Sequence, residues 1–161
     1  MKVQKKTEPW ACLVTSFAMV MDMECGDLIE RIGVDGGEVL ADGLVGPQQF
    51  RGHHIQEIID AALACGYAVT EIEANPHLLT KVGNLPIYEY KEAEKRFFNY
   101  LNTSTGVLVG YLVDRGWRHA YAVDKGIVYN PDTGTECEPP LSYRADTFYK
   151  VTNAQFTSTG A

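Results

Sequence analysis

A cysteine near the start of the chain has the sequence setting of a nucleophile. Cys12 follows Pro9 and opens an apolar segment whose spacing predicts a helix over residues 11–23. The free N–H groups and partial positive charge of a helix N-terminus favour the thiolate, which is the reactive form of cysteine. The other three cysteines are not expected at a helix start. The alternative is that Cys12 is a small apolar residue of the core.

A histidine in the second half of the chain is the candidate base for that thiol. His119 opens a predicted strand over 119–124, and a second predicted strand covers 127–130. Between them lies Lys125-Gly126, and glycine in such a position is typical of a two-residue hairpin turn. A side chain at the start of a strand is rigidly held, as a catalytic base must be.

The same hairpin predicts which residues orient the imidazole. A two-residue turn pairs His119 with Asp132 and Tyr121 with Asn130, so Asn130 and Asp132 share the sheet face of His119. An oxygen of either side chain could accept the ring N–H and hold the base, as in nucleophile–base–orienter triads. A three-residue loop would turn both side chains to the opposite face.

The remaining elements predict an α+β fold, with N-terminal helices packed on a C-terminal antiparallel sheet. The apolar spacing predicts further helices over 54–65 and 92–101 and further strands over 67–72, 107–113 and 147–151. The glycine-rich stretch 33–46 is expected to be a surface loop. The length of 161 residues favours one domain spanning 1–161.

Composition excludes several classes of protein. An apolar fraction of 45% with 22% charged residues is typical of globular chains, not of disordered ones. The net charge of −7 argues against a nucleic-acid partner, because such surfaces need clustered Lys and Arg. The four cysteines form no CxxC pair, and His53 and His54 have no third ligand in register, so we expect neither a metal nor another cofactor.

The N-terminal segment bears on location. Lys2, Lys5 and Lys6 precede an apolar run, as in a signal peptide, but Glu8 and Pro9 interrupt that pattern. We therefore expect a cytoplasmic protein, with secretion as the alternative, and no membrane partner because no apolar stretch approaches about 18 residues. Oligomeric state is left open by the sequence.

Two segments together resemble a known family. Gln4, then Cys12 at a helix start with the continuation Ser16-Phe-Ala-Met-Val, resembles the nucleophile segment of papain-like cysteine peptidases. The second segment, His119-Ala-Tyr-Ala-Val, a turn, then Asn130-Pro131, is similar to the base and orienter segment. The closest likeness is to the compact bacterial and phage branch related to bacteriocin-processing peptidases, which act on double-glycine leaders.

The resemblance implies a role for each matched residue. Cys12 would be the nucleophile, His119 the general base and acid, and Asn130 the orienter, with Asp132 as its substitute. Gln4 and the Cys12 backbone N–H would form the oxyanion hole. The implied activity is hydrolysis of a peptide or isopeptide-like amide through a thioester, with a protein or peptide as substrate.

Alternatives stay open for the activity and for the role of Trp117. Leu13 stands where the family usually has Gly, which allows a catalytically idle binding protein, an inhibitor or adaptor, with the same fold. A thiol acyltransferase would use the same triad with an amine in place of water. Trp117, beside His119, is expected either as a wall of the substrate site or as an ordinary core aromatic.

Overall fold

A six-stranded sheet occupies the centre of the computed structural model, which describes residues 1–40, 43–44, 46–74 and 92–154. Its order is β1-β6-β2-β3-β4-β5, and every neighbouring pair of strands is antiparallel. The strands are β1 (Tyr67–Glu73), β2 (Thr105–Leu112), β3 (Trp117–Asp124), β4 (Ile127–Asn130), β5 (Thr135–Glu136) and β6 (Tyr143–Asn153). The helices are α1 (Cys12–Val20), α2 (Cys25–Ile32), α3 (Ile55–Ala64) and α4 (Ala93–Thr103), with a 3-10 turn at Pro47–Gln49. The α+β class predicted from the sequence is therefore confirmed.

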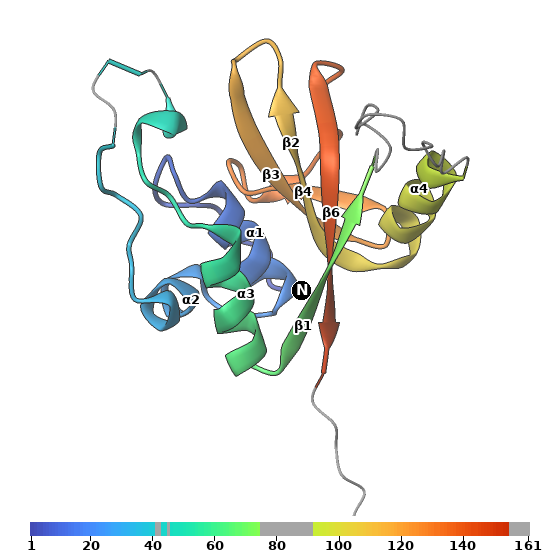
Figure 1. Ribbon diagram of the computed structural model, residues 1–161, viewed down its shortest axis with the longest axis horizontal. Helices are drawn as coiled ribbons and strands as arrows, with labels where there is room; N and C mark the ends of the chain where they lie inside the picture. Colours follow the sequence, from blue (N-terminus) through green and yellow to red (C-terminus); the bar gives the residue numbers. More distant parts are fainter. Residues whose placement is uncertain (41–42, 45, 75–91, 155–161) are drawn as a thin grey trace, which may run out of the picture.

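Helices lie on both sides of the sheet, with α1, α2 and α3 grouped on one side and α4 on the other (Figure 1). Alternation along β3 explains this, because Ala120 and Ala122 point into the cluster that contains α1. Tyr121 and Val123 point into the second cluster, together with Phe97 of α4. The small alanine side chains let α1 approach β3 closely, which brings the N-terminus of α1 to this strand.

The first helix is buried nearly all round and is shorter than predicted. Each residue from Val14 to Val20 is buried, because the sheet covers one side of α1 and α2 another. It ends at Val20 instead of near residue 23 because Asp22 has a left-handed backbone with φ 57°. The Asp22 N–H donates to Met19 O (3.1 Å) and the Met23 N–H to Ala18 O (3.0 Å), which is a Schellman cap.

The structure also contains a helix that the sequence analysis did not predict. α2 is short and includes Gly26, so its apolar spacing at Leu28, Ile29 and Ile32 was too brief to stand out. Gly33 ends it with φ 83°. In the stretch 33–46, the described residues form a loop apart from one isolated bridge between Val39 and Phe50.

The β3–β4 hairpin has the predicted register. Val123 pairs with Val128 and Asp124 with Ile127, and both turn residues, Lys125 (φ 48°) and Gly126 (φ 86°), are left-handed, as a type I′ turn requires. The last pair of this ladder is Ala122 with Tyr129, so residues 117–121 of β3 extend beyond the part paired with β4. The β3 edge next to His119 and Ala120 is therefore not covered by a paired β4 residue.

None of the helices within the described residues has the length and apolar character to span a bilayer.

Candidate active site

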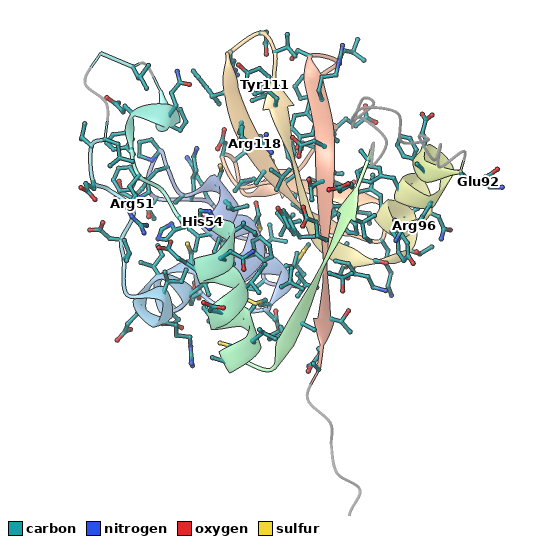
Figure 2. All side chains as sticks on the ribbon, viewed as in Figure 1. Arg51, His54, Glu92, Arg96, Tyr111 and Arg118 are labelled. Carbon is teal, nitrogen blue, oxygen red and sulfur yellow. The ribbon has the colours of Figure 1, made fainter. Side chains whose placement is uncertain are left out.

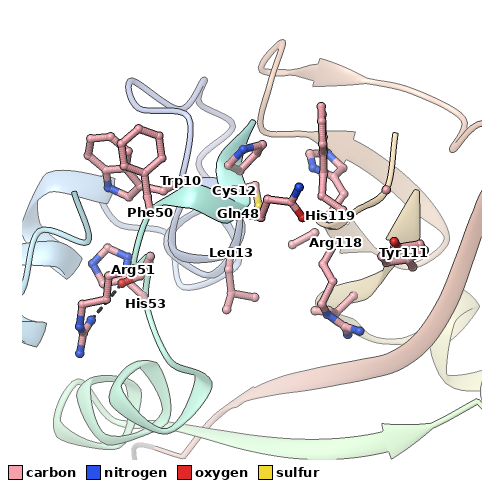
Figure 3. Close-up of a pocket in the computed structure, with 16 residues that line it drawn as sticks. Trp10, Cys12, Leu13, Gln48, Phe50, Arg51, His53, Tyr111, Arg118 and His119 are labelled. Carbon is pink, nitrogen blue, oxygen red and sulfur yellow. Dashed lines mark hydrogen bonds between the residues drawn. The ribbon is translucent and has the colours of Figure 1, made fainter. Parts of the chain in front are cut away.

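A cavity of about 570 Å³ lies between the helical layer and the sheet, and Cys12 and His119 both line it. Figure 3 shows its walls. Leu13 forms the floor near the middle of the view, Trp10 and Phe50 stand at one end, and Tyr111 and Arg118 stand at the other. The lining is mostly apolar, so polar groups within this cavity interact more strongly than they would in water.

Cys12 is the first residue of α1 and is half-buried in the cavity wall. The backbone N–H groups of Ala120 and Leu13 lie near its sulfur and favour the thiolate. The Ala120 group is a donor of the β3 edge that β4 leaves uncovered, so the thiol lies against the residue next to His119. Burial nevertheless raises the pKa of the Cys12 thiol, and the charge of Lys6 and these N–H groups lower it only in part.

The raised pKa of Cys12 is the opposite of the lowered pKa expected from a helix start alone. A helix start predicts a thiol biased toward the thiolate, but desolvation outweighs the favourable charge of Lys6 and the nearby backbone N–H groups at this site. The free protein therefore holds Cys12 as a neutral thiol near pH 7. Ionisation of Cys12 needs a base that takes the proton as the reaction begins.

His119 is buried, with 4% of its surface exposed, and its ring orientation is fixed by Asn130. The distance from His119 Nε2 to Asn130 Oδ1 is 3.1 Å. The Asp132 backbone N–H donates to the same Asn130 atom at 2.9 Å, which identifies that atom as the amide oxygen. His119 must then donate through Nε2–H, and its Nδ1 carries no proton in the neutral ring.

Asp132 approaches the same imidazole without bonding to it. Its Oδ2 lies 4.0 Å from His119 Nε2, and its Oδ1 pairs with Lys6 Nζ at 2.6 Å. Burial lowers the pKa of His119, while the Asp132 charge and the Asn130 hydrogen bond oppose that shift. Of the two orienters weighed from the sequence, Asn130 makes the direct contact and Asp132 supplies charge.

Aromatic rings support His119 from behind. The ring of Tyr121 meets the His119 ring edge to face, with centroids 4.7 Å apart at 86°. The Tyr143 hydroxyl donates to the His119 carbonyl at 3.2 Å. Trp117 lines the cavity and also packs against the second core cluster. A side chain at Gly46 would meet its ring at 2.7 Å, so Gly46 lets the loop lie flat on Trp117.

Gln4 is not brought to the cavity, which corrects the oxyanion role drawn from the resemblance. Its Nε2 donates to Met23 O at 2.8 Å and to Lys2 O at 3.3 Å, and its Oε1 accepts the Cys25 N–H at 2.8 Å. The side chain thus joins the N-terminal segment to the start of α2. The sequence patterns did not predict α2, so they could not show that the Gln4 amide bonds to the start of that helix.

Two residues of the site were missed by sequence reasoning. Gln48 lines the cavity, and Figure 3 shows its amide between the Cys12 sulfur and His119 in this view. Lys6 reaches the site through Asp132. Neither has a sequence signal of its own, since Gln48 lies in a loop and Lys6 in a run of surface-type lysines. Only the three-dimensional contacts reveal them.

No group of three or more His, Cys, Asp or Glu side chains within the described ranges is arranged to hold a metal ion. His54, which lies beside Arg51 at the start of α3 (Figure 2), caps that helix: its Nδ1 accepts the Gln56 N–H at 3.1 Å. Glu57 completes the cap by accepting the His54 N–H at 3.0 Å. His53 donates through Nε2 to Val34 O at 2.7 Å.

Comparison of the chain with protein-family models and with curated proteins finds no match.

Proposed function

We propose that this protein is a papain-like cysteine hydrolase that cleaves a peptide or isopeptide-like amide through a thioester. The observation that carries the proposal is the contact between His119 Nε2 and Asn130 Oδ1. Asn130 Oδ1 takes the Nε2–H, which leaves Nδ1 as a proton acceptor on a ring that shares its cavity with the Cys12 thiol.

The first half of the reaction forms the thioester. His119 Nδ1 takes the Cys12 proton while the sulfur attacks the carbonyl carbon of the amide. The carbonyl π electrons move to oxygen, and the resulting imidazolium donates its new proton to the leaving nitrogen. The C–N bond breaks, the amine departs, and the acyl group stays on sulfur.

The second half returns the enzyme to its starting state. Water attacks the thioester carbon and gives a proton to His119 Nδ1. The C–S bond then breaks, the carboxylic acid leaves, and the proton returns to the Cys12 sulfur. Asn130 keeps the ring in one orientation through both halves, and Asp132 favours the transient imidazolium.

Two donors near the sulfur suit the oxyanion of these intermediates. The Cys12 backbone N–H lies at the first position of α1, where an N–H group has no partner within the helix. The carbonyl four residues earlier, Glu8 O, accepts the Ala11 N–H at 3.1 Å. The Gln48 amide, which lines the same cavity as Cys12, replaces Gln4 as the second donor in this proposal.

The family resemblance supports the same proposal. Cysteine at a helix start, histidine on a strand and asparagine at the end of the next strand occur here in the papain-like order along the chain. Raised pKa for the thiol and lowered pKa for the imidazole favour an uncharged pair in the free protein. Proton transfer from Cys12 to His119 is then part of the attack on the substrate.

One residue favours the second candidate function, a catalytically idle binding protein. Leu13 lines the cavity where a smaller residue would leave more room beside the thiol. The binding protein would hold its partner unchanged, and partner binding would survive Cys12→Ala. A thiol acyltransferase remains a variant of the first proposal, distinguished by whether an added amine, instead of water, ends up on the acyl group.

The proposal is tested with the protein, a reductant, and a peptide mixture that includes isopeptide-linked peptides, with new termini identified by mass spectrometry. We expect cleavage by the parent protein and its loss, by at least three orders of magnitude, in Cys12→Ala and His119→Ala. Cys65→Ala, a change at the end of α3, is the matched control and should retain parent activity.

Thermal unfolding of each variant shows whether a loss of cleavage reflects loss of the fold. Cleavage that persists in folded Cys12→Ala would contradict the proposal. A protein that captures peptides without cutting them, equally well with and without Cys12, would establish the binding function instead.

A further inference from the structure

The ammonium group of Lys6 pairs with Asp132, whose carboxylate approaches His119, although Lys6 belongs to the N-terminal segment. Its Nζ is 2.6 Å from Asp132 Oδ1 and donates to Pro9 O at 3.3 Å. The Lys6 side chain is only 17% exposed, unlike an ordinary surface lysine. Apart from this ion pair, Asp132 Oδ1 is buried with no partner in the described part of the chain.

Backbone contacts hold Lys6 in this place. Its N–H donates to Pro131 O at 2.8 Å, so the N-terminal segment runs along the turn that follows β4. Gly134 in the same turn has φ 68°, and a side chain there would press on Lys5 N at 3.0 Å. The turn that presents Asn130 and Asp132 to His119 thus also fixes the position of Lys6.

The charges around the site come from several elements. The charged or titratable groups that act on the thiol or the imidazole, or line their cavity, are Lys6, Asp132, Arg115, Tyr143, His53, Tyr111, Arg118 paired with Asp146, and Arg51 paired with Glu57. Lys6 and Asp132 act in opposite directions. Asp132 raises the pKa of Cys12 and of His119, and Lys6 lowers both.

We propose that Lys6 is an electrostatic positioning residue of the site: it holds the Asp132 carboxylate beside His119 and supplies the positive charge that lets the nearby Cys12 sulfur ionise. Without it, an uncompensated carboxylate would face a thiol that must become an anion. This inference rests on the proposed function in taking Cys12 as the nucleophile, but its test reads the thiol directly.

The test is the pH dependence of iodoacetamide alkylation of the Cys12-containing peptide, followed by mass spectrometry on the folded full-length protein. In Lys6→Met we expect the midpoint to move to higher pH and the alkylation rate at pH 7 to fall roughly three- to tenfold. Lys6→Arg keeps the charge and should restore most of the rate. Lys5→Met, which removes a neighbouring exposed lysine, should match the parent.

The Asp132→Asn variant tests the inference independently, because it should shift the Cys12 alkylation midpoint in the opposite direction. The amide keeps an oxygen for Lys6 but removes the negative charge, so the Cys12 midpoint should move to lower pH. A folded Lys6→Met protein that alkylates like Lys5→Met would overturn the inference. If Lys6→Met does not fold, Asp132→Asn decides, because an unchanged or higher midpoint in that variant overturns it equally.

The outcome is separable from that of the proposed function. A Lys6-dependent shift in a protein whose peptide cleavage does not depend on Cys12 would leave the inference standing and refute the hydrolase. Cleavage that requires Cys12 but is indifferent to the Lys6 charge, with no midpoint shift, would do the reverse.

Discussion

The imidazole of His119 depends on a single oxygen atom for its orientation. Asn130 Oδ1 accepts both the ring N–H and the Asp132 N–H, so the amide is fixed by the turn and the ring is fixed by the amide. Burial of the ring means that water is a poor substitute for this acceptor. The orientation of the base is thus traced to an asparagine that begins a turn.

Replacing Asn130 should change the titration of His119 in a predictable order. Asn130→Ala removes a hydrogen bond that raises the pKa of His119, so the midpoint should fall below that of the parent. Asn130→Asp adds a negative charge at the same place and should raise the midpoint above it. An NMR titration of the His119 ring protons, assigned with His119→Gln, measures the three values.

Turnover of a cleaved peptide by Asn130→Ala should fall by roughly one to two orders of magnitude, because a misaligned base is inefficient. This loss is smaller than that expected for His119→Ala. Identical His119 midpoints in all three proteins would contradict the contact between Asn130 and His119.

Local patterns predicted the elements that carry the catalytic candidates. The β3–β4 register followed from Lys125-Gly126 alone, because both turn residues adopt the left-handed backbone that a two-residue turn requires. The start of α1 was also predictable, but its end was not, since Asp22 takes a conformation more typical of glycine. α2 escaped prediction because eight residues give too short an apolar period.

Long-range contacts were the part of the site that the sequence did not predict. The sequence spacing between Gln4 and Cys12 suits an oxyanion donor only if the Gln4 side chain points toward the thiol. In the structure, the Gln4 amide instead bonds to the start of α2. The place of Lys6 depends on a turn more than a hundred residues later in the chain. Such pairings have no periodic signature in a single sequence.

The N-terminal cap of α3 should make the protein sensitive to acid. Glu57 accepts hydrogen bonds from Arg51 and from the His54 N–H, which lowers its pKa from 4.5 to about 2. As pH falls below 4.5 the unfolded chain binds a proton that the folded protein does not, so stability is lost between pH 4.5 and about 2. Because Glu57 is 28% exposed, we expect about 1 to 2 kcal/mol, less than the full shift would give.

Urea unfolding at pH 7 and pH 3 checks this expectation. Glu57→Gln should be less stable than the parent at pH 7, and the difference should shrink at pH 3. Asp60→Asn, an exposed acid of the same helix, is the control and should cost less at pH 7. A difference between parent and Glu57→Gln that is the same at both pH values would show that the carboxylate charge is not responsible.

Across the whole molecule, the N-terminal segment joins the helices to the sheet. The Lys2 N–H donates to Met19 O of α1 at 3.0 Å, Gln4 bonds to the start of α2, and Lys6 bonds to Pro131 after β4. A segment without regular secondary structure thus contacts three separate parts of the protein. These contacts help to set the position of the helices on one side of the cavity relative to the sheet on the other.

Gln4→Ala tests this structural role against the catalytic one implied by the resemblance. Loss of the bonds to Met23 O and the Cys25 N–H should lower the free energy of unfolding by about 1 to 2 kcal/mol. The pH profile of Cys12 alkylation should stay that of the parent. Gln56→Ala, at an exposed position of α3, is the control and should be near neutral.

Urea unfolding and alkylation are measured on the same preparations. A Gln4→Ala protein of parent stability that has lost peptide cleavage would return Gln4 to the oxyanion hole and contradict the contacts described here.

The distance along the chain between Cys12 and its partners has a consequence for synthesis. Lys6 and Cys12 are synthesised more than a hundred residues before His119, Asn130 and Asp132. Until the β3–β4 hairpin pairs and its closing turn meets the N-terminal segment, the thiol has neither a base nor its balancing charges. A nascent chain that has not yet reached this hairpin therefore carries the cysteine without its proposed base, and in the proposed mechanism the site becomes reactive only when residues 117–134 have folded.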